Sequence, residues 1–133
     1  QMPGTGGIMK MDLPEVRRTL GIALAKGDMV RSAVLRGGQI YMEAAARSVA
    51  KVQPFTNETS LRLDGMYHAV HHTVGEIIEL LVRCASTSSL RDGSRMQRYF
   101  RDAVMLRSRR EQLDIKALDI AREYLEQEGY LAG

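Results

Sequence analysis

The chain has 133 residues, 44% hydrophobic and 26% charged, a balance that is typical of a globular protein and excludes a disordered one. The net charge of +3 is too small to indicate a nucleic-acid-binding domain. The single cysteine excludes an internal disulfide and no apolar run is long enough to span a membrane, so we expect a cytoplasmic protein that binds neither nucleic acid nor membranes.

The N-terminal region is predicted to be a flexible loop over residues 1–11, because it contains three glycines and a proline. A helical domain is expected to follow over 12–133. Its first helix is predicted to begin at Asp12, which has capping-box spacing to Glu15, and Pro14 suits the first turn.

A second helical stretch is expected over residues 28–52, after the helix breaker Gly27. Paired glycines are poor helix formers, so a bend or break is predicted at Gly37-Gly38. The segment that follows contains Pro54, which ends the stretch, and either Thr56 or Asn57 is expected to cap the next helix.

The third predicted helix carries one continuous apolar stripe at helical spacing: Leu63, Met66, Tyr67, Val70, Val74, Ile77, Ile78, Leu81 and Cys84. A fourth helix is expected to begin at Ser94, which forms a capping box with Gln97. Its apolar stripe is interrupted over 107–112 and resumes over 113–125. Helices of this length joined by short loops predict an all-α fold, an antiparallel up-down four-helix bundle.

Three features suggest chemistry at first sight and are interpreted as structural. His68, His72 and Glu76 share helical spacing, but their face lies opposite the apolar stripe and no further ligand completes a site, so no metal is predicted. Cys84 is expected to be a small buried hydrophobic residue. The glycine-rich segment over 4–7 lacks the strand and the Lys-Ser/Thr pair of a phosphate-binding loop.

The fourth predicted helix is more informative. Arg95, Arg98 and Arg101 are spaced three residues apart, which predicts one basic ridge near the helix N-terminus, and Asp102 is placed to orient Arg98. Such a ridge suits a phosphate or pyrophosphate, since the helix dipole is positive there. The alternative is a solvated face with one weak ion pair. The hydroxyl-rich turn over 85–89 would let a ligand approach the backbone.

The hexapeptide Gln97-Arg98-Tyr99-Phe100-Arg101-Asp102, preceded by this small-residue turn and a long helix, resembles the C-terminal helical domain of the acyl-CoA dehydrogenase superfamily. It is most similar in style to the flavin-dependent monooxygenase branch. The helix layout extends the resemblance over residues 12–128.

This resemblance implies a domain that drives dimer or tetramer assembly and covers FAD or FMN together with partner domains of a larger flavoenzyme. The residues assigned to the cofactor are Ser86, Thr87, Ser88, Arg95 and Arg98, and those assigned to structure or assembly are Gln97, Arg101 and Asp102.

The sequence departs from the family where a catalytic glutamate stands in a Glu-Gly-Thr context, because residues 107–111 read Arg-Ser-Arg-Arg-Glu. No catalytic residue is assigned, and the chain is expected to be inactive alone. Two alternatives stay open: a helical dimerisation or interaction module without a cofactor, and a regulatory domain whose basic ridge binds an anionic partner.

Overall fold

The computed structural model describes residues 12–85, 91–107 and 110–131, and all regular structure within these ranges is helical. Four helices follow one another along the chain: α1 (Pro14–Val49), α2 (Asn57–Cys84), α3 (Arg95–Arg107) and α4 (Arg110–Gln127). The all-α prediction is confirmed. The loop predicted over residues 1–11 lies outside the described ranges.

Helix α1 is continuous over 36 residues, so the separation predicted at Gly27 and the break predicted at Gly37-Gly38 are both wrong. α1 packs along α2 for much of its length, and this packing outweighs the cost of about 1 kcal/mol that each glycine adds to a helix. The predicted cap is also wrong. Leu13 occupies the cap position and makes no side-chain capping bond, while Asp12 instead pairs with Arg17 at 2.7 Å.

Thr56, one of the two residues predicted to cap the next helix, is the N-cap of α2. The Thr56 hydroxyl accepts a hydrogen bond from the backbone N–H of Thr59 at 3.2 Å, so Thr56 is the cap and Asn57 the first helical residue.

The single fourth helix of the prediction is two helices, α3 and α4. The boundary falls inside the segment where the apolar stripe is interrupted. The Ser94 cap is confirmed, because its hydroxyl accepts a hydrogen bond from the Gln97 backbone N–H at 3.1 Å.

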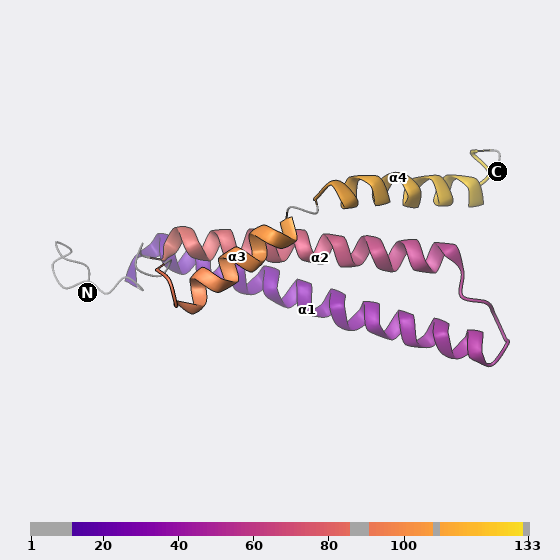
Figure 1. Ribbon diagram of the computed structural model, residues 1–133, viewed down its shortest axis with the longest axis horizontal. Coiled ribbons are helices and arrows are strands. Elements are labelled where there is room, and N and C mark those ends of the chain that lie inside the picture. Colours follow the sequence, from indigo (N-terminus) through magenta and orange to yellow (C-terminus); the bar gives the residue numbers. More distant parts are fainter. Residues whose placement is uncertain (1–11, 86–90, 108–109, 132–133) are drawn as a thin grey trace.

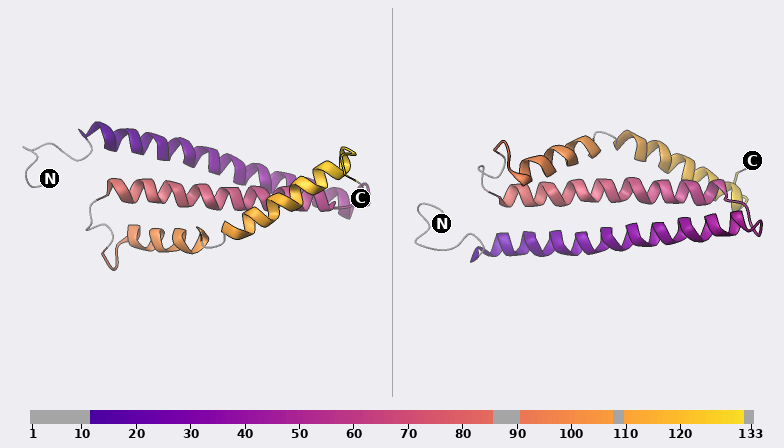
Figure 2. Two further views of the ribbon diagram at one scale, coloured as in Figure 1. Left: turned by 90° about the horizontal axis from the view of Figure 1, so that it is seen from above. Right: turned by 60° about the horizontal axis from the view of Figure 1, so that its bottom comes forward.

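Helix α2 is central in the molecule. After the turn near Pro54, α2 runs back along α1, and α3 and then α4 run back along α2 from its other end (Figures 1 and 2). Every extensive contact between the described helices involves α2. The four helices therefore form three antiparallel limbs, with α3 and α4 sharing the third limb, and a closed up-down four-helix bundle is not confirmed.

This open arrangement buries little of the chain. Apart from residues 107 and 110–113, the residues of the described ranges that are buried are Val16, Ala23, Gly75 and Ala103. The accessible surface is 9969 Å², whereas a compact monomer of this mass would have about 7,000 Å². Large apolar side chains lie exposed on every helix, among them Leu35, Tyr67, Val104 and Leu118.

Candidate anion site at the start of α3

The turn before α3 explains how the sequence places this site. Gly93 has φ +83°, a left-handed conformation that favours glycine, and the Ser94 backbone N–H donates to the Arg91 carbonyl oxygen at 3.1 Å. The Ser94 side chain then caps α3. The Asp-Gly-Ser sequence thus reverses the chain and starts the helix within three residues.

A depression of about 660 Å³ surrounds this helix start. Its lining carries three arginines and one carboxylate, and comprises Asp92, Gly93, Ser94, Arg95, Gln97, Arg98, Tyr99 and Arg101. The excess of positive charge lies at the end of α3 where the helix dipole is also positive, so the depression favours an anion.

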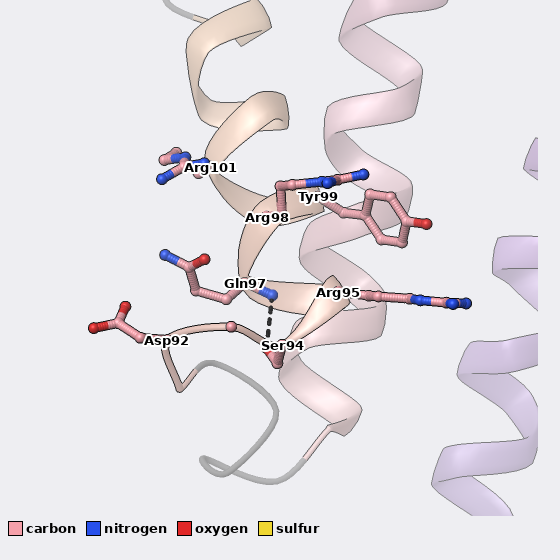
Figure 3. A pocket seen from close by; sticks show the side chains of 8 residues that line it. Asp92, Ser94, Arg95, Gln97, Arg98, Tyr99 and Arg101 are labelled. Carbon is pink, nitrogen blue, oxygen red and sulfur yellow. Dashed lines mark hydrogen bonds between the residues drawn. The ribbon is translucent and has the colours of Figure 1, made fainter.

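The arginines do not form the single ridge that their spacing predicts. Figure 3 shows Arg95, Arg98 and Tyr99 directed to one side of α3, while Arg101 lies on the other side with Gln97 and Asp92. A spacing of three residues turns the helix by about 300°, so two such steps carry Arg101 well away from Arg95. Arg95 and Arg98 are therefore the pair that can approach one ligand together.

Neither Arg95 nor Arg98 has a carboxylate partner within the described part of the chain. The expected pairing of Arg98 with Asp102 is absent, and both side chains are exposed. Two unpaired guanidinium groups keep all of their hydrogen-bond donors available for a phosphate.

The remaining predicted residues have less defined roles in the structure. Ser86, Thr87 and Ser88 lie outside the described ranges. Gln97 is half-buried and contributes its backbone N–H to the Ser94 cap, whereas Arg101 and Asp102 are exposed and directly precede the buried Ala103.

Sequence reasoning missed Asp92, Gly93 and Tyr99, which also line the depression. The Asp-Gly dipeptide was the available signal for the turn, since it marks reversals of the chain. The spacing of Tyr99 along the helix does not distinguish it from a core residue. In the structure its side chain is 47% exposed.

The histidine face of α2, which lies opposite the apolar stripe in the sequence pattern, is engaged within the protein. His68 Nε2 lies 3.6 Å from Asp64, and its side chain is only 11% exposed. His72 Nδ1 lies 3.5 Å from Glu76, which also pairs with Lys26 of α1 at 2.5 Å. A central helix is covered on more than one side, so its polar face is used for contacts.

No three His, Cys, Asp or Glu side chains of the described residues are grouped so that they could hold a metal ion. Cys84, expected to be buried, is half-buried. No described helix has both the length and the apolar character needed to cross a membrane.

The donor set fits one part of a flavin nucleotide better than the other. Arg95, Arg98 and the N-terminus of α3 suit a phosphate or pyrophosphate group. An isoalloxazine ring needs a flat apolar surface, and Tyr99 is the one aromatic side chain that lines the depression. The residues present therefore fit the phosphate end, and nothing here fits the ring.

The chain matches a known protein family. Residues 18–109 match the family described as acyl-CoA dehydrogenase, C-terminal domain. The matched segment includes nearly all of α1, all of α2 and α3, and the hexapeptide over 97–102, and it ends before α4. Comparisons with curated proteins and with solved structures gave no match.

Proposed function

The chain belongs to the family of acyl-CoA dehydrogenase C-terminal domains, and on that premise we propose that residues 12–133 form the helical assembly domain of a flavin-dependent oxidoreductase. The domain self-associates as a dimer or tetramer, contributes to a flavin site and is inactive alone. Acyl-CoA dehydrogenases usually bind flavin, and the family match is the observation that carries this proposal.

The burial pattern supports self-association. Few residues of the described part are buried, and large apolar side chains are exposed on every helix. A second chain that covers these side chains would stabilise the protein. Exposed apolar surface of this extent marks interaction sites in soluble proteins.

The charge pattern supports a contribution to the flavin site. The guanidinium groups of Arg95 and Arg98 would hold the cofactor's pyrophosphate, and the hydroxyls of residues 86–88 precede them along the chain. A bound flavin would accept the hydride from the substrate. This chain supplies phosphate binding and orientation, while the surface against which the ring packs comes from a partner domain.

A titration tests the flavin role. We expect the chain to bind FAD, followed by flavin fluorescence, and to bind riboflavin, which lacks phosphate, far more weakly. Replacing Arg95→Glu with Arg98→Glu should weaken FAD binding by at least about tenfold, because charge-assisted hydrogen bonds contribute about 1.5–3 kcal/mol each.

The matched control is Arg18→Glu with Arg62→Glu, which changes the charge equally at exposed sites outside the depression. If both double variants lost the same FAD affinity, the loss would be explained by net charge alone, and a specific site would be contradicted. Association without any FAD binding would favour the alternative, an interaction module without a cofactor. Binding to an acidic protein partner that weakens steeply with salt would favour the regulatory alternative.

A further inference from the structure

A second apolar face lies on α1 beside the face that packs on α2. Five large apolar side chains on this face are 54–83% exposed: Val34, Leu35, Tyr41, Met42 and Val49. A helix of a monomeric protein ordinarily carries polar side chains on the face away from its neighbour. α1 therefore presents an apolar surface that nothing in the described structure covers.

The spacing of this face matches a helix as its partner. Val34, Gly38, Tyr41 and Ala45 alternate steps of four and three residues, while Leu35, Met42 and Val49 repeat every seven residues beside them. A seven-residue repeat keeps one seam facing another helix over several turns.

The middle of this face is hollowed. A groove of about 290 Å³ runs between α1 and α2 and is lined by Ala33, Val34, Gly37, Gly38, Tyr41, Leu63, Met66, Tyr67 and Val70. A Cβ on Gly38 would meet nothing within 4 Å, so the space above Gly38 is open to a ligand or a neighbouring chain. The Tyr41 ring stands beside it, held edge-on against Phe55 at 5.8 Å between ring centroids.

The exposed apolar area approaches that of a specific protein–protein contact. The five exposed side chains present roughly 100 Å² each, or about 500 Å² together, on the scale of a fully buried aliphatic residue. The groove walls add to this, and a standard interface buries about 800 Å² on each partner.

We propose that a second copy of this chain packs its α1 antiparallel against this face, so that Tyr41 of each copy fills the groove above Gly38 of the other. This inference rests on the proposed self-association and identifies its surface. In the antiparallel register that pairs Gly38 with Tyr41, Val34 pairs with Ala45, so each layer of the seam places a larger side chain against a smaller one. The contact is the same on both copies, as a two-fold axis requires.

The charge of the seam supports this orientation. Arg31 is exposed and stands seven residues before Gly38, on the same seam. A parallel dimer would place Arg31 against its own counterpart, which is repulsive. The antiparallel register places Arg31 against Ser48.

Sedimentation of the whole chain tests the surface. We expect the wild-type chain to dimerise reversibly and Gly38→Glu to weaken dimerisation by about tenfold or more. The monomer should accept this substitution, because a Cβ at Gly38 meets nothing and glutamate favours helix over glycine. Gly21→Glu is the matched control: Gly21 is also on α1, exposed and open, but outside the seam, so we expect unchanged dimerisation and unchanged helicity by circular dichroism.

The outcomes separate this inference from the proposed function. A wild-type chain that stays monomeric overturns both. A wild-type chain that associates while Gly38→Glu associates equally well overturns only the assigned surface.

Orientation is tested by disulfide trapping in a Cys84→Ser background, which removes the native thiol. When Gly38→Cys and Tyr41→Cys chains are mixed under oxidising conditions, we expect the cross-linked product to contain one of each. Predominant links between identical positions would indicate a parallel pair and overturn the antiparallel register.

Discussion

Gly65 lies where α4 packs against α2. A Cβ at this position would stand 2.5 Å from the terminal Cδ1 carbon of Ile120, far inside van der Waals contact. The absence of a side chain at Gly65 is therefore what allows Ile120 to seat on α2. Nearby, Lys116 of α4 pairs with Asp64 of α2 at 3.2 Å. This pair is more than a third exposed and adds at most about 1 kcal/mol, so the apolar contact is the more specific of the two.

A double-mutant cycle at Gly65 and Ile120 tests this contact. In the wild-type background we expect Gly65→Ala to be nearly neutral, because a gain of about 1 kcal/mol in helix propensity is offset by the forced rotation of Ile120. In an Ile120→Val background, where the clashing carbon is gone, Gly65→Ala should stabilise by about 1 kcal/mol. Urea unfolding measures both values. Equal effects in the two backgrounds would show that the two residues do not touch.

At the scale of the element, helix ends decide where each limb turns. α1 ends at Val49, and Lys51 then takes φ +56°, a left-handed conformation that is strained for a residue with a side chain. The Val52 backbone N–H donates to the Arg47 carbonyl oxygen at 3.0 Å, which closes the helix end. The position is one that glycine usually occupies.

Lys51→Gly should therefore raise the free energy of unfolding by up to about 1 kcal/mol, because relief of the left-handed strain exceeds the added entropy of the unfolded chain. Gly129, after the end of α4, has φ +77° and is the reciprocal control. Gly129→Ala is expected to destabilise the protein by a similar amount, as measured by thermal unfolding. A destabilised Lys51→Gly variant would contradict the assigned end of α1.

Helix starts were predictable from the sequence where the cap is a local hydrogen bond. Thr56 and Ser94 each bond a backbone N–H three residues ahead. Ser94 is predicted from its spacing to Gln97, and Thr56 is one of two predicted candidates, the other being Asn57. Asp12 has the same signature, yet its carboxylate is taken by Arg17. A side chain with two possible partners cannot be assigned from spacing alone.

The course of the helices was harder to predict, because it depends on packing between distant segments. Gly37 and Gly38 predict a break by propensity, but α1 continues because Gly37 packs against Met66 and Leu63 of α2. The interrupted stripe over 107–112 was expected to lie within one helix, and it is where α3 gives way to α4.

The candidate site was also predictable in its residue types but not in its three-dimensional arrangement. Its residue types were recognisable, and Arg95, Arg98, Arg101 and Gln97 do surround one depression. The directions of these side chains were not predictable, since Arg101 is turned away from the other two arginines (Figure 3). The cofactor, the oligomer and the cytoplasmic location stay predictions.

At the scale of the whole molecule, three limbs with α2 in the middle do not enclose a core. Four buried residues in the described ranges supply far less burial than a stable domain of this length needs against its conformational entropy. The ion pair between Lys26 and Glu76 joins α1 to α2, but partly exposed pairs of this kind contribute about 0–1 kcal/mol. Under the proposed function, surfaces that meet another chain would supply the missing stability.

The most direct test of this account is thermal unfolding of the wild-type chain over about a hundredfold range of concentration, because a protein stabilised by self-association melts at a temperature that depends on concentration. We predict that the unfolding midpoint rises steadily with chain concentration and that the rise is reduced in Gly38→Glu but kept in Gly21→Glu. A midpoint that is high and independent of concentration would show that one chain is stable by itself, and would contradict the assembly role.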